Sequence, residues 1–390
     1  MRTKPAILAF FALATIATQG LFTSCSSDEN LSTEKPSTGT QTLKINLKPA
    51  DTRAAAYTDP GTDAENKINR VTIGIFDKTT GAVKTIQDAL NAAAPEIITS
   101  QLVADDHILV AVNAPAGTFT GVLTELAFEK STLGIDDALP VSGTGTVDPA
   151  NLPMFGAAKI TQIGTTPAYT ADVAVSHMVA KVTLKSLKVA FDATGAYKDA
   201  TFTPTEVFMY NVPDKLDFDF YPANTPTSYV YNYLTTPTNT PNYYNGLIGD
   251  ASLKSYLGTG TLDGTLKDKT LATTSNWGTA GTNLLYLYTM PNNSTKPTQL
   301  VIKGSFDPDG KGTTVPVYYP VNINYNSDNG NAAEGTTPKQ VYPNKNYIVD
   351  VIIKGKGADS PTKSLDPETV TANIVTVNSF VDATQSNTFN

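Results

Sequence analysis

Alternation of apolar and polar residues marks the first structured segment of this chain. In residues 42–48, the apolar side chains of Leu43, Ile45 and Leu47 are separated by polar ones, and Pro49 follows. Successive side chains of a β-strand point to opposite faces, so this period of two predicts a half-buried strand. Proline lacks a backbone donor, which favours an end of the strand at this point.

Similar patterns recur to the end of the chain. The run 107–112 is continuously apolar, which predicts a strand buried on both faces. Asp77-Lys78-Thr79-Thr80-Gly81 predicts a turn, and a short helix is expected within residues 119–139. Further strands are expected at residues 71–75, 158–163, 173–179, 181–191, 284–290, 299–306, 314–325, 345–354 and 370–381.

The apolar pattern changes phase within residues 181–191. Val182 and Leu184 share one parity, whereas Leu187 and Val189 share the other. A slip of one residue moves side chains to the opposite face, so we expect a β-bulge or a strand that switches sheets there. A domain boundary is placed near this point.

Composition favours a β-rich exported protein. The chain has 390 residues, of which only 16% are charged, and a length of this order suits two or three domains. Many short strands separated by turn residues predict an all-β fold of β-sandwiches. The net charge of −8 disfavours nucleic acid and anionic membrane surfaces as partners.

The first residues predict a secretory signal that ends in a lipid anchor. Arg2 and Lys4 precede a short apolar run at residues 7–16. Cys25 is the only cysteine, which excludes an internal disulfide, and it directly follows this leader. Residues 21–25, Leu-Phe-Thr-Ser-Cys, resemble a bacterial lipobox, so Cys25 is the expected lipidation site; a buried free thiol is the alternative. Residues 26–29 resemble the acidic export tag of Bacteroidetes surface lipoproteins.

Only three arginines occur, and two of them follow the first predicted strand. Arg53 lies in the small-residue run Thr52-Arg53-Ala54-Ala55-Ala56, where a loop is expected. Arg70 directly precedes the core strand expected at Val71, so its backbone should be held. Proteolysis concentrates in exposed loops of small and polar residues, which favours Arg53 as a cleavage site.

Several motifs, in order, resemble the fimbrillins, the type V pilins of Bacteroidales. No single motif is specific, but their order and spacing cover most of the chain, apart from residues 205–280. They are the lipobox at Cys25, Arg53 in Thr-Arg-Ala, residues 69–73 (Asn-Arg-Val-Thr-Ile), 109–114 (Leu-Val-Ala-Val-Asn-Ala), 152–154 (Leu-Pro-Met), 179–183 (Val-Ala-Lys-Val-Thr), 342–347 (Tyr-Pro-Asn-Lys-Asn-Tyr) and the final strand at 371–377.

The resemblance implies a precursor that polymerises after proteolysis. In such a precursor an arginine-specific or trypsin-like protease cuts between Arg53 and Ala54, and the strand carrying Leu43, Ile45 and Leu47 leaves. A C-terminal strand of the next identical subunit then fills the groove, by the exchange known as donor-strand complementation. The expected donor residues are Val370, Ala372, Ile374, Val375, Val377 and Phe380.

The same resemblance implies two tandem transthyretin-like β-sandwiches. The expected divisions are a signal peptide at 1–24, a lipidated propeptide at 25–53, and sandwiches at 54–178 and 179–390, with the donor region at 370–390. The precursor would be held on the outer membrane through Cys25 before it joins a surface fimbria that supports adhesion. Accessory anchor and tip pilins are expected as further partners.

Other functional sites have weaker support in the sequence. His107 and His177 are the only histidines and lack partners at metal spacing, so ordinary sheet histidines are expected, with no metal and no cofactor. Residues 307–312, Asp-Pro-Asp-Gly-Lys-Gly, resemble half a calcium loop but favour a turn. No arrangement of residues indicates an enzyme. The alternative function is glycan capture by a surface lipoprotein that uses tyrosines in residues 229–233 and 243–244.

Overall fold

The computed structural model describes most of the chain after residue 40. The described residues are 41–49, 62–90, 96–99, 101–140, 147–164, 168–219, 229–230, 246–247, 270–271, 285–293, 297–324, 340–360 and 370–374. Residues 37–390 belong to one compact unit, and residues 1–36 lie outside the described part.

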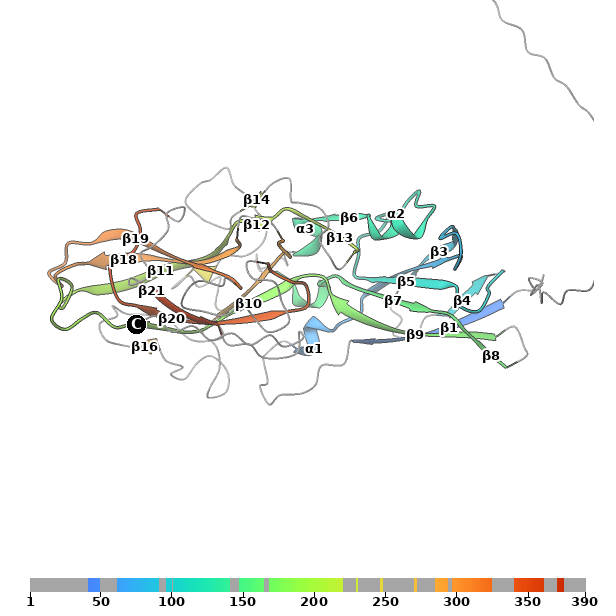
Figure 1. The fold of residues 1–390 in the computed structure, drawn as a ribbon, viewed down its shortest axis with the longest axis horizontal. Coiled ribbons are helices and arrows are strands. Elements are labelled where there is room, and N and C mark those ends of the chain that lie inside the picture. Colours follow the sequence, from blue (N-terminus) through green and yellow to red (C-terminus); the bar gives the residue numbers. More distant parts are fainter. Residues whose placement is uncertain are drawn as a thin grey trace, which may run out of the picture. The chain divides into compact units, whose positions relative to one another are not determined.

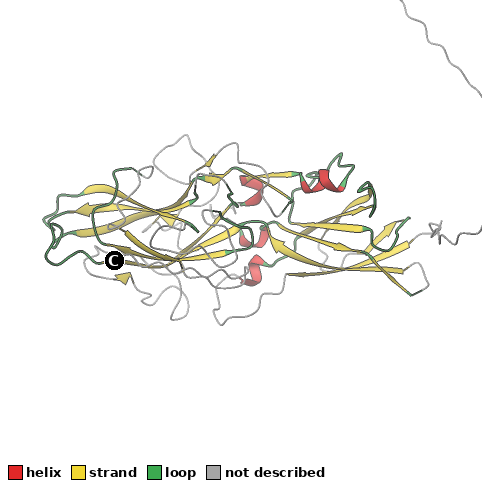
Figure 2. Cartoon of the chain, in the orientation of Figure 1, coloured by secondary structure: helices red, strands yellow, loops and turns green. Residues whose placement is uncertain are grey.

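Strands dominate the described residues, so the all-β prediction is confirmed (Figure 2). The first half contains β1 (Gln41–Pro49), β2 (Arg70–Phe76), β3 (Val83–Leu90), β4 (Glu96–Thr99), β5 (His107–Val112), β6 (Thr132–Gly134), β7 (Met154–Lys159), β8 (Thr161–Ile163) and β9 (Ala168–His177). The second half contains β10 (Ala180–Val189), β11 (Thr201–Tyr210), β12 (Val212–Pro213), β13 (Lys215–Asp217), β14 (Tyr229–Val230), β15 (Gly246–Leu247), β16 (Thr270–Leu271), β17 (Leu285–Thr289), β18 (Gln299–Asp307), β19 (Val315–Asn322), β20 (Asn346–Ile353) and β21 (Val370–Ile374).

The helices are all short. They are α1 (Thr62–Glu65), α2 (Glu125–Glu129), α3 (Ile135–Ala138) and the 3-10 turn η1 (Pro149–Asn151). α2 confirms the helix expected within residues 119–139, and its first turn is capped by the side chain of Thr124, which accepts a hydrogen bond from Ala127 N.

In the described residues, strands of the first half form one eight-stranded sheet in the order β3-β2-β5-β7-β9-β1-β4, with β8 also paired to β9 (Figure 1). A core of side chains from β1, β2, β4, β5 and β9 fills this region. Ile108, Leu109, Val110, Ala111 and Val112 are all buried, as predicted for a strand covered on both faces.

Strands of the second half form their own sheets. In the described part, β16-β10-β20-β21 make one sheet, with β17 also paired to β10, and β15-β11-β18-β19 make another. Val182, Leu184, Leu187 and Val189 are all buried in β10. The register against β20 shifts between Leu184 and Ser186, which confirms the predicted bulge and explains why apolar residues of both parities face one core.

Two local features refine the predicted elements. The turn after β2 forms because Asp77 Oδ1 accepts hydrogen bonds from the backbone of Thr79 and Thr80, at 3.0 and 2.9 Å. These bonds, that of Thr80 first, lower the pKa of Asp77 to about 2. The single strand expected at residues 158–163 is wrong, because Ile160 bonds to Asp105 and Asp106 and thereby separates β7 from β8.

Candidate functional site

The N-terminal strand β1 is an interior strand of the first sheet. It runs parallel to β9, with Thr42 opposite Ala168 and Pro49 opposite Val175, and its first residues pair antiparallel with β4 (Figure 1). Within the described residues β1 is the only strand that pairs with β4. We call the trough that β1 occupies between β9 and β4 the β1 groove.

The apolar side chains of β1 complete the core of the first sheet. Leu43, Ile45 and Leu47 are 0%, 1% and 8% exposed, whereas Lys44 and Asn46 face solvent. The three apolar residues pack in one cluster with side chains of β2, β5 and β9. Burying such a side chain contributes about 1.5–3 kcal/mol, so this face contributes roughly 5–9 kcal/mol. The structure therefore brings together the three residues predicted for the removable strand.

A buried glutamine fixes the start of β1, and the sequence analysis missed it. Gln41 is 1% exposed, and its side-chain amide bonds to the backbone of Leu102 as a neighbouring strand would. Leu102 N donates to Gln41 Oε1 at 2.5 Å, and Gln41 Nε2 donates to Leu102 O at 3.2 Å. The hydroxyl of Tyr169 lies 3.3 Å from Gln41 Nε2 and donates to Leu102 O at 3.0 Å. The sequence does carry a signal for Gln41, because this residue lies two positions before Leu43 and so belongs to the same core-facing row of β1.

The predicted lipidation and cleavage positions lie outside the described residues. These are Cys25, Arg53 and Ala54. Arg70, the alternative cleavage position, lies in β2. Its backbone is bonded to Asn113, with Asn113 N donating to Arg70 O at 2.9 Å, and its guanidinium pairs with Asp88. The backbone of Arg70 is therefore held in a sheet, whereas a protease needs a segment whose backbone is free to enter its active site.

Part of the predicted donor segment forms the last described strand. Val370, Ala372 and Ile374 lie in β21, which pairs antiparallel with β20 at the edge of its sheet. Val375, Val377 and Phe380 lie outside the described residues. The structure thus shows that the segment has strand conformation over its first five residues, on its own sheet.

A buried ion pair fixes the short helix that precedes β2. Glu65 Oε1 in α1 accepts hydrogen bonds from Lys181 Nζ, at 2.9 Å, and from the hydroxyl of Tyr288. Glu65 and Lys181 are both 1% exposed. The ring of His177 contacts Glu65 O at 3.0 Å, and burial lowers the pKa of this histidine despite neighbouring Glu65 and Asn344. His177 thus lies buried in β9 and takes part in this hydrogen-bonded group.

The other sites considered in the sequence make local contacts where the structure describes them. His107 Nδ1 lies 2.9 Å from a carboxylate oxygen of Glu125. Asp307 Oδ2 accepts a hydrogen bond from Gly312 N at 2.6 Å, as the predicted turn requires. Across the residues that the structure describes, no group of three or more His, Cys, Asp or Glu side chains could hold a metal ion. Of the tyrosines proposed for glycan capture, only Tyr229 lies in a described segment.

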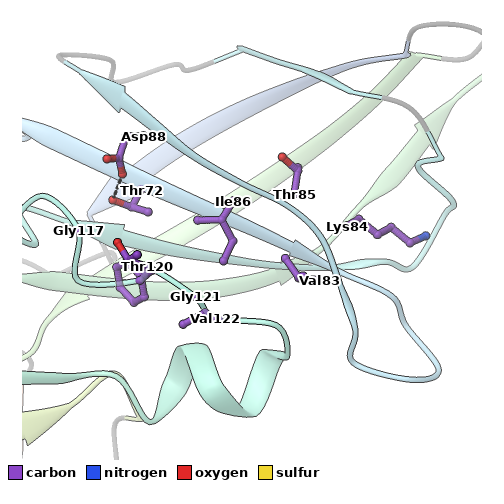
Figure 3. Close-up of a pocket in the computed structure, with 11 residues that line it drawn as sticks. Thr72, Val83, Lys84, Thr85, Ile86, Asp88, Gly117, Thr120, Gly121 and Val122 are labelled. Atoms are coloured by element: carbon purple, nitrogen blue, oxygen red, sulfur yellow. Dashed lines mark hydrogen bonds between the residues drawn. The ribbon is translucent and has the colours of Figure 1, made fainter. Parts of the chain in front are cut away.

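A shallow cavity of about 440 Å³ lies beside β3, away from the β1 groove (Figure 3). Its walls are β3 residues such as Thr85 and Ile86 and the loop from Gly117 to Val122. Thr72 donates to Asp88 across its floor at 2.6 Å. None of the helices in the described residues has the length and apolarity of a membrane span.

Part of the chain matches a known protein family. Residues 41–185 match the family described as major fimbrial subunit protein (FimA). No curated protein sequence matches the chain significantly.

Solved structures share the fold over most of the chain. A fimbrilin of Porphyromonas gingivalis has a TM-score of 0.53 at 16% identity and covers 85% of this chain and 96% of its own. A candidate cell adhesion protein of Bacteroides eggerthii has a TM-score of 0.58 at 18% identity, covering 90% and 98%. One of Parabacteroides distasonis has a TM-score of 0.56 at 14% identity, covering 86% and 96%. The family match bears out the fimbrillin resemblance over residues 41–185, and the solved structures share the fold of the chain.

Proposed function

We propose that this protein is the shaft subunit of a surface fimbria that supports adhesion, and that it polymerises by protease-triggered donor-strand exchange. In this proposal the precursor carries lipid on Cys25 at the outer membrane. An arginine-specific or trypsin-like protease cuts between Arg53 and Ala54. β1 then leaves, and the C-terminal segment of an identical subunit takes its place. The role is structural, with no catalytic step on the subunit itself.

The observation that carries the proposal is the place of β1 in the fold. An N-terminal strand of nine residues, Gln41–Pro49, supplies three buried apolar side chains to the core and pairs with two neighbours. Its loss opens a trough lined with apolar side chains and with unpaired backbone groups of β9 and β4. Unpaired strand edges bind extended chains, because an incoming strand satisfies the backbone and fills the side-chain positions at once.

Energetics explain why cleavage is needed first. Burial of the apolar side chains stabilises a strand in the groove by roughly 5–9 kcal/mol, and each backbone hydrogen bond adds about 0.5–1.5 kcal/mol. Both β1 and a donor strand can gain this free energy. Association of separate subunits costs an estimated 4–15 kcal/mol. β1, tethered to its own groove, does not pay this cost and has a high effective concentration. The uncut precursor therefore stays monomeric.

The same proposal divides the chain into two tandem transthyretin-like sandwiches near residues 178–179. All strands of the eight-stranded sheet come before Met178, and the strands of the two larger sheets of the second half come after it. Among the described strands, β6 with β13 is the pairing that crosses this point. The donor segment begins at the edge strand β21, which a subunit can release by breaking a single ladder with β20.

The test is the N-terminus of assembled material, with Arg53→Ala and Arg70→Ala as a matched pair of variants. We expect fibres from the wild type and from Arg70→Ala to begin at Ala54, and Arg53→Ala to remain an uncut monomer. Assembly is followed on unheated gels and by electron microscopy. Fibres that begin at Val71, or fibres from uncut Arg53→Ala, would contradict the proposal.

A second variant tests the donor. A chain shortened after Ile374 keeps β21 and should fold and be cut normally but form no ladders. Unimpaired ladders would remove the C-terminal segment from the mechanism.

A further inference from the structure

We infer that the site around Leu102 and Tyr169 recognises a side-chain carboxamide of the incoming strand, and that Asn373 of the neighbouring subunit supplies it. The inference rests on the proposed strand exchange and names the residue that would set its register.

Departure of β1 removes the amide partner of a buried site. Gln41 bonds to both the N–H and the C=O of Leu102, at 2.5 and 3.2 Å, and Tyr169 shares the same carbonyl. Leu102 is 1% exposed and Tyr169 6%. Tyr169 still donates to the Leu102 carbonyl when β1 is absent, but the Leu102 N–H loses its acceptor. A buried donor without a partner is costly, so an apolar strand that merely filled the groove would leave this end unstable.

The chemistry of the site selects one class of side chain. A backbone N–H and C=O side by side need an acceptor and a donor on one short planar group. Asparagine and glutamine carry both on separate atoms, and serine and threonine carry both on a single oxygen. Ionised aspartate and glutamate offer only acceptors, and lysine and arginine only donors. The position also lies in the core-facing row of β1, two residues before Leu43. The donor must therefore carry a carboxamide followed by apolar residues at the second and fourth positions.

The C-terminal segment contains this pattern once in a form that fits. Asn373 is followed by Val375 and Val377 at the positions of Leu43 and Ile45. Ser379, six residues after Asn373, would take the position of Leu47. Leu47 is 8% exposed and is the most exposed of the three apolar residues of β1.

Other carboxamides in the segment give worse matches. Asn378 would place Asp382 in the position of Ile45, and burying an unpaired carboxylate is strongly unfavourable. Gln385 would place Asn387 in the position of Leu43. Asn373 thus sets a register in which the donor runs parallel to β9, as β1 does. In this chain Asn373 lies opposite Asp350 in the β20–β21 ladder, so β21 must leave β20 before it donates.

The test uses the full-length precursor, cut with a trypsin-like protease, with variants Asn373→Leu, Asn373→Gln and, as control, Asn378→Leu. Asn378 has the opposite parity to Asn373, so its side chain would face away from the core. We expect Asn373→Leu to slow ladder formation about tenfold or more. Asn378→Leu should assemble at the wild-type rate. Asn373→Gln, which has the length of Gln41, should match or exceed that rate.

Hydrogen exchange at the Leu102 amide separates this inference from the proposed function. The amide should be protected in the precursor and in wild-type polymer, and should exchange rapidly in Asn373→Leu polymer. Wild-type rates and full protection in Asn373→Leu would overturn the carboxamide inference while leaving strand exchange intact. Failure of the cut wild-type protein to assemble would instead refute the proposed function.

A second measurement tests the inference even if the Asn373→Leu variant fails to fold. Synthetic peptides of residues 370–381, with Asn, Gln or Leu at position 373, are added to cut wild-type protein. The Asn and Gln peptides should inhibit ladder formation at about tenfold lower concentration than the Leu peptide. Equal inhibition by all three would overturn the inference.

Discussion

Truncation of Ile45 provides a direct measure of how firmly β1 is held. The side chain is 1% exposed and packs in the core with β2, β5 and β9. Replacement of a buried isoleucine by alanine typically costs about 2–5 kcal/mol, because burial is lost and a cavity remains. We expect Ile45→Ala to lower the unfolding free energy of the uncut precursor by this amount. Lys44→Ala, on the exposed face of the same strand, should change it little.

The same substitution should weaken retention of β1 after cleavage. A loss of about 2–5 kcal/mol corresponds to roughly 30- to 4,000-fold in the equilibrium constant for the strand in its groove. Urea denaturation of the uncut precursor gives the first quantity. Co-elution of the cut N-terminal fragment with the body in size-exclusion chromatography gives the second.

Two outcomes would refute this reasoning. If Ile45→Ala and Lys44→Ala had equal effects on the urea midpoint, the strand would not be packed as described. If the Ile45→Ala precursor were destabilised but its cut fragment were retained as in the wild type, packing of β1 would not govern its release. The expected order of fragment release is Ile45→Ala first, with Lys44→Ala and the wild type together.

Other parts of the fold give further predictions. Gly156→Ala in β7 should destabilise the protein by about 1–3 kcal/mol, because a Cβ would lie 2.2 Å from a backbone oxygen of β9; Ala157→Ser on the exposed face of β7 is the control for thermal unfolding. Lys181→Met should cost about 3–5 kcal/mol by stranding the buried carboxylate of Glu65, and adding Glu65→Leu should recover most of it in a double-mutant cycle. Burial lowers the pKa of His177 in the folded state, so the histidine of the unfolded state takes up a proton first as the pH falls. The free energy of unfolding should therefore decrease as the pH falls below the ordinary histidine pKa of 6.5. His177→Gln should lose less stability than the wild type between about pH 7.5 and 5.

Strands with an alternating apolar pattern could be predicted from the sequence. Alternation identified β1, in which every second side chain enters the core, and also β2 and β20, in which most of the intervening side chains are buried as well. The phase slip in β10 identified its bulge. The four-residue strand β4 was missed because it is too short to show a period. β3 was missed because its side chains are half-buried rather than sorted between two faces.

The polar contacts of the candidate site could not be predicted in the same way. Gln41 and Leu102 are 61 residues apart, and Glu65 and Tyr288 are 223 apart, so pattern along the chain carries no information about either pair. Lys181 did carry a signal, since a charged residue within the apolar run around Val182 needs a buried partner. Which glutamate would provide it depends on the tertiary fold alone.

The pairing of β1 on both edges has a mechanical consequence for a fibre. A replacement strand in the same place would have eight residues opposite β9 and four opposite β4. Tension along the fibre would pull this strand lengthwise, so both rows of hydrogen bonds would bear the load together instead of opening one after another. A joint of this kind would yield only when the whole strand slides.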